Sequence, residues 1–421
     1  MCNDEKKVKI IYYSDCYFFA GCENMLISFF RSNQIKSNFD ITFVYGYSKR
    51  YEEGLNDRLT NNIKIIPMKY FSINSLYSVI NYLDNIIIQK ILRILIRLLM
   101  IEYLFFVYDI FRLIIIFKKI KPEILHINNG GYPGSYSCLS AVFAARYCRI
   151  NKVIFVINNI ITPYNSIFRF IDKPIDWFVK NNMTIFITGS KYACDKLRLL
   201  WNLADGRAIN VPNTITPRTL IESRESLLKR LNIKNDKIIL CNIALLEKRK
   251  GQKYLVESIG IIKKDFENDY NKFILIIEGE GREYCNLINL SKILGVNKNI
   301  IFIQKEKNIF DLMNIIDVFI LPSIENEDFP NVILESMSFG KPIIGTDIAG
   351  IPEQIKNNVN GFIVKPRDPK ELSNAILQMV NNEKMRVEMG KKSLEIYNEL
   401  FSYEKIMKKY INIYNNLSFN K

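Results

Sequence analysis

NEDFPNVILESMSFGKP (residues 326–342) is the most informative segment of this chain. The apolar run Asp317–Pro322 before it indicates a buried parallel strand. Asp328 is expected to cap a helix, with Pro330 in the first turn, where a missing N–H costs nothing. Gly340 is expected to end that helix before the next strand. The stretch therefore predicts a helix whose N-terminus opens at the carboxyl end of a strand.

Two carboxylates, Glu327 and Glu335, stand with seven residues between them around this predicted helix start. In doubly wound sheets, ligands bind at the carboxyl ends of the strands. Free N–H groups and the helix dipole favour a phosphate there, and a flanking carboxylate can accept hydrogen bonds from sugar hydroxyls. The glutamate spacing alone would be a weak indication, but the apolar and glycine pattern around it favours a binding site.

The segment resembles the Glu-x7-Glu signature of the family 4 retaining glycosyltransferases, which have the two-domain GT-B fold. Asp328 and Ser336 stand where the family usually has glycine and alanine. The resemblance implies that Glu327 contacts hydroxyls of the donor sugar and that Glu335 binds the nucleotide ribose. Backbone amides between them would hold the diphosphate and the sugar. The donor-binding positions implied in this loop are Phe329, Asn331 and Val332.

The bulk composition fits a globular protein with more than one domain. A chain of 421 residues is too long for one ordinary core, and 48% hydrophobic with 24% charged residues excludes a disordered chain. Residues 1–13 lack the pattern of a signal peptide. The eight cysteines are scattered without C-x-x-C spacing, and His126 is the single histidine. We therefore expect reduced thiols, with neither a metal site nor a disulfide framework.

The formal charge of +15 is concentrated in the N-terminal half, which carries +11 up to Pro212. No nucleic-acid-binding motif accompanies it, so we expect no nucleic-acid partner. An anionic membrane surface is one explanation, and drift toward a composition rich in Lys, Asn and Ile is the other. The apolar stretch 86–117, interrupted by charges, is either an interfacial helix on the inner membrane face or a helix packed on the first domain.

Short apolar strands alternate with helical stretches throughout, which predicts an α/β chain with two Rossmann-like, doubly wound parallel sheets. The first series of predicted strands is 8–13, 41–45, 63–66, 124–128, 152–157 and 185–188. The second series is 238–243, 273–278, 300–303, 318–321, 343–346 and 361–364. By the GT-B resemblance, residues 1–212 form an acceptor-side domain completed by a terminal helix in 401–421. Residues 213–400 form the nucleotide-sugar-binding domain, and the two domains face each other across a cleft.

A basic turn, Lys248-Arg249-Lys250-Gly251, follows the first strand of the second domain. It resembles the family's Arg-Leu-x-x-x-Lys-Gly motif, in which both cations contact the donor diphosphate. Leu245 occupies the arginine position, so Arg249 or Lys248 would supply the second charge. A fixed cation stabilises a leaving diphosphate more in the transition state than in the ground state.

Two further motifs resemble donor-site segments of the family. Gly279 and Gly281 match a Gly-x-Gly turn beside the nucleotide, although a purely structural turn is an equally good interpretation. Ile303 ends the strand whose backbone meets the nucleobase in the family. No dinucleotide fingerprint or P-loop follows the glycines, which argues against a dehydrogenase or an NTPase.

In the first domain, Phe19-Ala20-Gly21-Cys22-Glu23 resembles the family's Gly-Gly-x-Glu loop, so Gly21 and Cys22 are the expected acceptor-side positions. The strand at 124–128 resembles one that often reads His-x-His. His126 matches the more structural histidine, and Asn128 stands at the position that faces the reacting centre. The chain has no Asp-x-Asp motif, which suits a site without a metal ion or other cofactor.

The resemblance implies a retaining glycosyltransferase that moves a sugar from a nucleotide-diphosphate donor to a hydroxyl of a glycan or lipid-linked acceptor. Cell-surface polysaccharide or lipopolysaccharide synthesis at the inner face of a bacterial membrane is the expected setting. The expected catalytic residues are Glu327, Lys250 and Asn128. Two alternatives remain open: a sugar-nucleotide epimerase or hydrolase on the same fold, and a non-catalytic membrane-surface protein.

Overall fold

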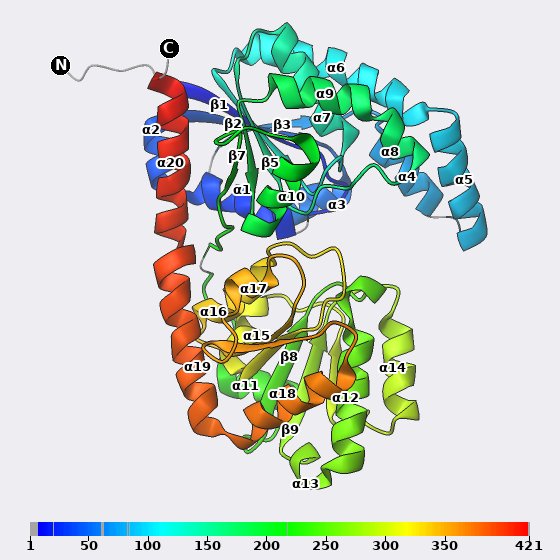
Figure 1. The fold of residues 1–421 in the computed structure, drawn as a ribbon, viewed down its shortest axis with the longest axis vertical. Helices are drawn as coiled ribbons and strands as arrows, with labels where there is room; N and C mark the ends of the chain where they lie inside the picture. The colour runs from blue at the N-terminus through cyan, green and yellow to red at the C-terminus, as the bar shows by residue number, and fades with distance from the viewer. Residues whose placement is uncertain are drawn as a thin grey trace, which may run out of the picture. The chain divides into compact units, whose positions relative to one another are not determined.

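The protein is described by a computed structural model that covers residues 7–19, 21–59, 63–81, 83, 85–216 and 218–419. Residues 1–6, Ala20 and Pro217, on which parts of the predictions fall, lie outside the described residues. The chain forms two compact units (Figure 1). Unit 1 comprises Met1–Pro212 with Tyr403–Lys421, and unit 2 comprises Asn213–Ser402. The sequence prediction placed the first boundary at the same residue and the return at 401.

Unit 1 is built on a seven-stranded parallel sheet in the order β3-β2-β1-β4-β5-β6-β7. Its strands are β1 (Val8–Ser14), β2 (Phe39–Gly46), β3 (Lys64–Met68), β4 (Ile124–Asn129), β5 (Lys152–Ile157), β6 (Ile185–Thr188) and β7 (Ala208–Asn210). The six strands predicted for this half are confirmed. The edge strand β7 was missed, because three residues are too few to show a periodicity.

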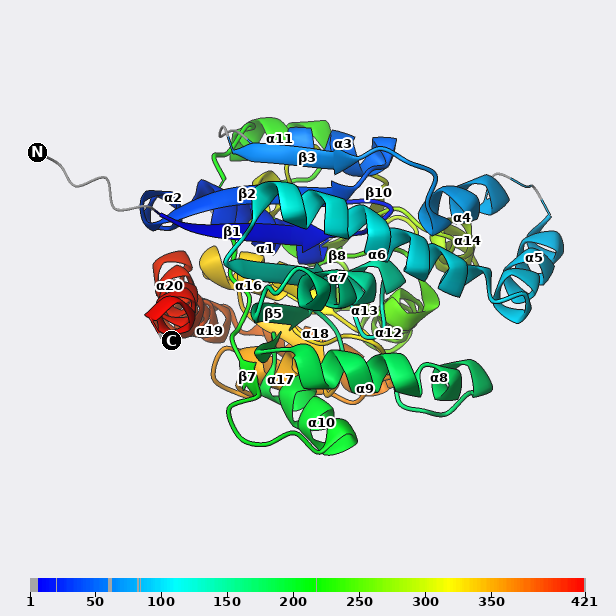
Figure 2. The same cartoon turned by 90° about the horizontal axis from the view of Figure 1, so that it is seen from above.

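Helices cover both faces of this sheet (Figures 1 and 2). The helices of unit 1 are α1 (Gly21–Arg31), α2 (Asn33–Asn38), α3 (Lys49–Asn56), α4 (Ile73–Asn81), α5 (Ile86–Leu98), α6 (Ile101–Ile120), α7 (Tyr136–Tyr147), α8 (Ile167–Ile171), α9 (Lys173–Asn182), α10 (Lys191–Trp201) and α20 (Tyr403–Phe419). Strand side chains alternate between the faces. Ile11 and Tyr13 pack in the core with α6 and α7, whereas Tyr12 packs with α1 and with Tyr414 of α20. The C-terminal helix therefore closes one face of unit 1.

Unit 2 repeats the design with a six-stranded parallel sheet in the order β10-β9-β8-β11-β12-β13. All its strands were predicted: β8 (Ile238–Ile243), β9 (Phe273–Glu278), β10 (Ile300–Ile303), β11 (Val318–Leu321), β12 (Ile343–Thr346) and β13 (Gly361–Val364). The helices are α11 (Arg224–Arg230), α12 (Gln252–Asp265), α13 (Glu267–Tyr270), α14 (Tyr284–Ile293), α15 (Ile309–Ile315), α16 (Asn331–Ser338), α17 (Ile351–Gln354), α18 (Pro369–Asn381) and α19 (Glu383–Ile396). A 3-10 turn (Lys248–Lys250) precedes α12, and a π-helical turn (Tyr397–Phe401) follows α19.

Both sheets are doubly wound, as predicted, and each has one point where the strand order reverses. In unit 1 this point lies between β1 and β4, where Ser14 pairs with Asn128. In unit 2 it lies between β8 and β11. Ligands of doubly wound folds bind at the carboxyl ends of the strands beside this reversal. The loops after β8 and β11 are therefore the first place to look for a site in unit 2.

The start of α16 differs from the prediction. The helix begins at Asn331, with Pro330 at the N-cap position and no side-chain cap bond, so the assignment of Asp328 as N-cap was wrong. Asp328 is buried instead of lying at an exposed helix end. Gly340 ends the helix as predicted: its φ is 63°, and its N–H bonds to the Met337 carbonyl at 2.9 Å.

The apolar stretch 86–117 divides into two helices with different surroundings. α6 buries Phe106, Leu113 and Phe117 against the sheet and α7, as a packed helix would. In α5 only Ile96 is buried. α4 and α5 lie at the end of unit 1 away from α2 and α20 (Figures 1 and 2). Among the helices of the described residues, none has the length and apolar content needed to cross a bilayer.

Candidate functional site

The loop after β8 and the loop after β11 are held together by a backbone hydrogen bond. The N–H of Ile324 bonds to the Arg249 carbonyl at 2.8 Å. Gly251 has a φ of 70°, and a Cβ there would lie 1.9 Å from the Pro322 carbonyl oxygen. Only glycine fits this close approach. The turn that carries Lys250 is thus held directly beside the loop that carries Glu327.

Lys250 and Glu327 form an ion pair at this junction. The ammonium of Lys250 donates to the Glu327 carboxylate, and the Ser323 hydroxyl donates to the same carboxylate at 3.1 Å. Each of the two charged side chains is only 11% exposed. Two residues that are 77 positions apart in the sequence are therefore brought together with little water around them. Charges attract each other more strongly where little water surrounds them. The ammonium of such a pair can also bind an anion, and its carboxylate can accept hydrogen bonds from hydroxyl groups.

Arg249 also reaches this carboxylate, at a longer distance. Its guanidinium donates to Glu247 at 2.8 Å and to the Asn326 carbonyl at 3.0 Å, and it lies 3.8 Å from the Glu327 carboxylate. Lys248 is exposed and makes no ion pair with any described residue. The geometry therefore favours Arg249 over Lys248 as the second cation beside Lys250.

The predicted positions on α16 lie at its first turn and one turn further along. Asn331 and Val332 open the helix, and Glu335 follows with its side chain buried. The Phe329 side chain packs in the core against Phe401 at a ring distance of 5.5 Å. The Phe329 side chain therefore belongs to the core of unit 2, and its carbonyl accepts a hydrogen bond from the Asn213 side chain at 3.4 Å.

The predicted glycine turn after β9 is required sterically. A Cβ at Gly279 would lie 1.9 Å from the Ala244 carbonyl oxygen, and one at Gly281 would lie 2.2 Å from that of Leu246. The Gly279 N–H bonds to the Ile303 carbonyl at 2.8 Å. The turn is therefore packed directly against the loop after β8, which also carries Lys250.

Sequence analysis missed Glu278, the last residue of β9. Its carboxyl is buried and accepts a hydrogen bond from the Glu306 N–H at 3.1 Å. Burial raises the pKa of Glu278 to about 7, and the negative charges of Glu306 and Glu280 act in the same direction. The residue was passed over because a glutamate before a glycine turn looks like an ordinary surface residue.

The raised pKa of Glu278 gives a testable dependence of stability on pH. Because the folded state holds this proton more tightly than the unfolded state does, stability is expected to fall as the pH rises from about 4.5 to about 7. The expected loss between pH 5 and pH 8 is about 1 to 3 kcal/mol relative to Glu278→Gln. Chemical denaturation of both proteins at the two pH values measures it. Equal pH dependence in the wild type and the variant would contradict the assignment.

In unit 1, the predicted acceptor-side positions lie at the start of α1. Gly21 is exposed and Cys22 is half-buried. The Asn128 side chain donates to the Cys22 carbonyl at 3.5 Å and accepts from the Asn158 amide at 2.9 Å. Asn128 therefore holds the loop between β1 and α1 in place.

His126 is a core residue, in agreement with its structural interpretation. It is fully buried between aromatic rings, and the Tyr414 hydroxyl lies 2.9 Å from its Nδ1. Burial lowers the pKa of His126 to about 3, so the ring is neutral at physiological pH.

A cavity of about 690 Å³ opens in unit 1 beside α3 and α4. Its lining is aromatic and polar with charges of both signs, and includes Tyr17, Tyr47, Lys49, Arg50, Glu53, Asn74 and Asn81. Lys49 and Arg50 make no ion pair within the described part of the chain. Stacking rings, amides and open cations are the groups that bind saccharides and anions.

Comparison with known proteins shows what unit 2 is similar to. Residues 223–395 match the family model of the glycosyl transferases group 1. N-acetyl-alpha-D-glucosaminyl L-malate synthase of Bacillus anthracis is 30% identical over 188 residues, which are 45% of this chain and 48% of that protein. The chain thus spans about half the length of this relative. An uncharacterized glycosyltransferase of Methanocaldococcus jannaschii is 25% identical over 432 residues, which cover 98% of this chain and 99% of the relative.

Solved structures extend the similarity to the whole fold. The crystal structure of Anabaena HepE in complex with UDP matches with a TM-score of 0.73 and 14% identity, covering 97% of this chain and all of HepE. Two doubly wound parallel sheets, linked as they are here, are the architecture of the GT-B fold. These matches support a glycosyltransferase. The chain therefore has the two-domain GT-B fold, and its residues 223–395 carry the pattern of the glycosyl transferases group 1.

Proposed function

We propose that this chain is a retaining glycosyltransferase that transfers a sugar from a nucleotide-diphosphate donor to a hydroxyl of a glycan or lipid-linked acceptor. The observation that carries the proposal is the Lys250–Glu327 ion pair, enclosed at the strand-order reversal of unit 2 and close in sequence to the start of α16. The pair offers a cation for phosphate and a carboxylate for hydroxyls in one place. The structure of HepE with UDP supports a nucleotide as the donor group.

The proposed roles follow from the chemistry of each group. Lys250, assisted by Arg249, would bind the diphosphate and stabilise the charge that grows on it as the bond to the sugar breaks. Glu327 would then accept hydrogen bonds from the sugar hydroxyls, and Glu335 from the ribose. Amides of Asn331 and Val332 would complete the phosphate site. Since cations and amides supply the electrostatic stabilisation, the proposed reaction needs no metal ion.

The remaining predicted positions would shape the two substrate sites. Gly279 and Gly281 allow the backbone after β9 to lie close to the nucleotide, and the Ile303 backbone would meet the base. In unit 1, Gly21 and Cys22 would border the acceptor and Asn128 would hold their loop. The cavity lined by Lys49 and Arg50 would receive the anionic or saccharide part of the acceptor.

A donor screen tests the proposal. Thermal unfolding of the chain with UDP- and GDP-sugars is expected to show stabilisation by one donor, because a ligand bound only by the folded state raises the apparent stability. With that donor and a matching acceptor extract, sugar transfer is expected without added Mg²⁺ or Mn²⁺. Donor breakdown or epimerisation without an acceptor would instead indicate the hydrolase or epimerase. A dependence on either ion would overturn metal independence.

The names of several relatives support a role in cell-surface glycan synthesis. They include an O-antigen biosynthesis glycosyltransferase of Escherichia coli and the capsular polysaccharide biosynthesis glycosyltransferase CapM of Staphylococcus aureus. Acceptors in such pathways are carried on membrane lipids, as the diphospho-undecaprenol in the name of a Campylobacter jejuni relative indicates. We therefore propose the inner face of the plasma membrane as the site of action.

The surface of α5 supports peripheral membrane binding. Two of its polar side chains bond to the segment before it: Gln89 donates to the Leu83 carbonyl at 2.7 Å, and Arg93 donates to the Asn81 side chain at 2.5 Å. Lys90 is exposed, and Arg97, 56% exposed, lies 4.0 Å from Glu102. Most of the exposed side chains of α5 are large and apolar, namely Ile86, Ile87, Ile88, Ile91, Ile94, Leu95 and Leu98. A soluble helix normally has the opposite arrangement. With the surplus of basic residues in this half of the chain, this face fits an anionic bilayer.

Replacing Ile94 and Leu98 of α5 together by aspartate is expected to abolish most binding to vesicles that contain anionic lipid. Two charges would have to enter the interface, where apolar contact supplies the affinity. Vesicle flotation measures the bound fraction. Val387→Asp, at a side chain of α19 that is 65% exposed, is the matched control. Wild-type protein that remains unbound, or that self-associates through this face, would contradict the proposal.

A further inference from the structure

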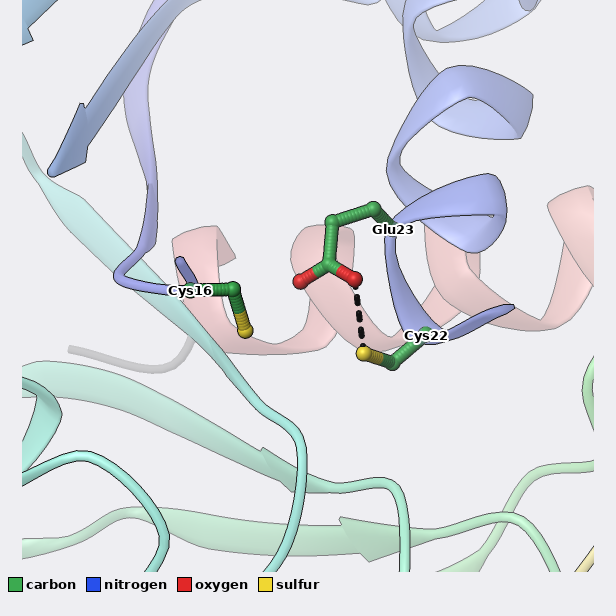
Figure 3. Close-up of side chains that lie close together, drawn as sticks. All are labelled: Cys16, Cys22 and Glu23. Atoms are coloured by element: carbon green, nitrogen blue, oxygen red, sulfur yellow. Dashed lines mark hydrogen bonds between the residues drawn. The ribbon is translucent and has the colours of Figure 1, made fainter. Parts of the chain in front are cut away.

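Two thiols and a buried carboxylate meet at the start of α1. Cys16 lies just after β1, and Cys22 and Glu23 lie in the first turn of α1. One ligand atom of each of these three residues lies within 4.8 Å of the others. Figure 3 shows all three side chains turned toward one another. The Cys22 thiol donates to the Glu23 carboxylate at 2.7 Å.

The spacing of these atoms is close to that of ligands around one ion. Bonds of about 2.3 Å to sulfur and about 2.1 Å to oxygen in a tetrahedral site separate the ligand atoms by about 3.6 to 3.8 Å. Shifts of about 1 Å from the distances here would reach that arrangement. Two sulfurs and one carboxylate select a thiophilic divalent cation over Mg²⁺ or Ca²⁺, which prefer oxygen.

Neighbouring residues form hydrogen bonds to the candidate ligands and can hold them in position. The Ser14 hydroxyl donates to the Glu23 carboxylate at 3.3 Å, which orients it. The backbone of Cys22 is held by Asn128.

We propose that Cys16, Cys22 and Glu23 bind one thiophilic divalent cation such as Zn²⁺. On binding, each thiol releases its proton to solvent and bonds to the ion through sulfur, and nothing is oxidised. Water would fill the fourth position. The ion would tie the end of β1 to the first turn of α1 and so fix the loop that carries Gly21. Its role would be structural, separate from the proposed chemistry at Lys250 and Glu327.

Cobalt titration of the wild-type protein tests this directly. Reduced protein without an affinity tag, freed of metal, is expected to bind one equivalent of Co²⁺ and to develop a thiolate-to-cobalt charge-transfer band in the near ultraviolet. One equivalent of Zn²⁺ should then remove the band. Absence of the band in folded protein would overturn the proposal. A second result would also overturn it. If the protein takes up no metal, and mild oxidation lowers its mass by two units while Cys16 and Cys22 stop reacting with thiol reagents, the two cysteines form a redox-active disulfide instead.

Single substitutions assign the ligands. Cys16→Ser and Cys22→Ser are each expected to lower Zn²⁺ affinity at least 100-fold in competition with a chromophoric chelator, and Glu23→Gln about 10-fold or more. Cys285→Ser, at an exposed thiol of α14, is the matched control and should bind Zn²⁺ like the wild type. Circular dichroism checks that each variant is folded. Unchanged affinity in a folded Cys16→Ser or Cys22→Ser variant would refute the site.

Discussion

Replacing Lys250 by methionine is expected to lower kcat/KM for sugar transfer by about 100- to 1,000-fold, the usual cost of removing one preorganised group that stabilises developing charge. Most of the loss should fall on kcat, because the diphosphate carries more negative charge as it departs than when it is bound to the sugar. Glu327 would keep the hydroxyl of Ser323 at 3.1 Å and the guanidinium of Arg249 at 3.8 Å, so the fold should survive. Initial rates over a range of donor concentrations separate kcat from KM.

Lys253→Met is the matched control for this prediction. Lys253 lies three residues further along, on α12, with a side chain that is 63% exposed and 3.6 Å from Glu257. A surface ion pair of this kind contributes little, and transfer by this variant should match the wild type. If Lys250→Met retained more than about a third of wild-type turnover while folded, the proposed role of Lys250 would be excluded.

Replacing Glu335 by alanine is expected to weaken the binding of the nucleotide diphosphate by about 30- to 900-fold. This range corresponds to the loss of charged hydrogen bonds to two ribose hydroxyls, about 2 to 4 kcal/mol. Glu335→Gln keeps the volume of a buried side chain and should lose a smaller part of the affinity. Isothermal titration calorimetry with UDP and GDP measures both variants.

Glu388→Ala, at an exposed position of α19, controls for the removal of one negative charge from unit 2. It should bind the nucleotide like the wild type. Donor affinity that is unchanged in a folded Glu335→Ala variant would show that Glu335 serves only the packing of α16, where it is buried.

All strands except β7 could be predicted, because each of them is an apolar run that can be recognised locally. Parallel strands covered on both faces must be continuously apolar, and runs such as Val318–Leu321 and Ile238–Ile243 can be recognised without knowing their neighbours. The helix stop at Gly340 is local as well. The start of α16 could not be predicted in this way. Aspartate is a residue type that often caps helices, but Asp328 is buried within unit 2. The helix begins at Asn331, with Pro330 at the N-cap position.

The sequence motifs could propose residues for the candidate site, but they could not predict which of these residues contact one another. Lys250 and Glu327 were singled out by their motifs, yet their contact depends on Gly251 lying against Pro322 and on the pairing of β8 with β11. Glu278 and the Cys16–Cys22–Glu23 cluster carried no recognisable spacing. A buried carboxyl or a group of ligands is defined by neighbours from other segments, which periodicity cannot reveal.

The two parallel α/β sheets could be recognised from the amino-acid sequence, because strands and helices depend on local apolar patterns and short motifs. Which charges meet, which carboxyl has a raised pKa and which side chains of α5 remain exposed became known from the folded structure alone. Those properties arise from distances and burial between remote segments, and such distances exist only once the chain has folded.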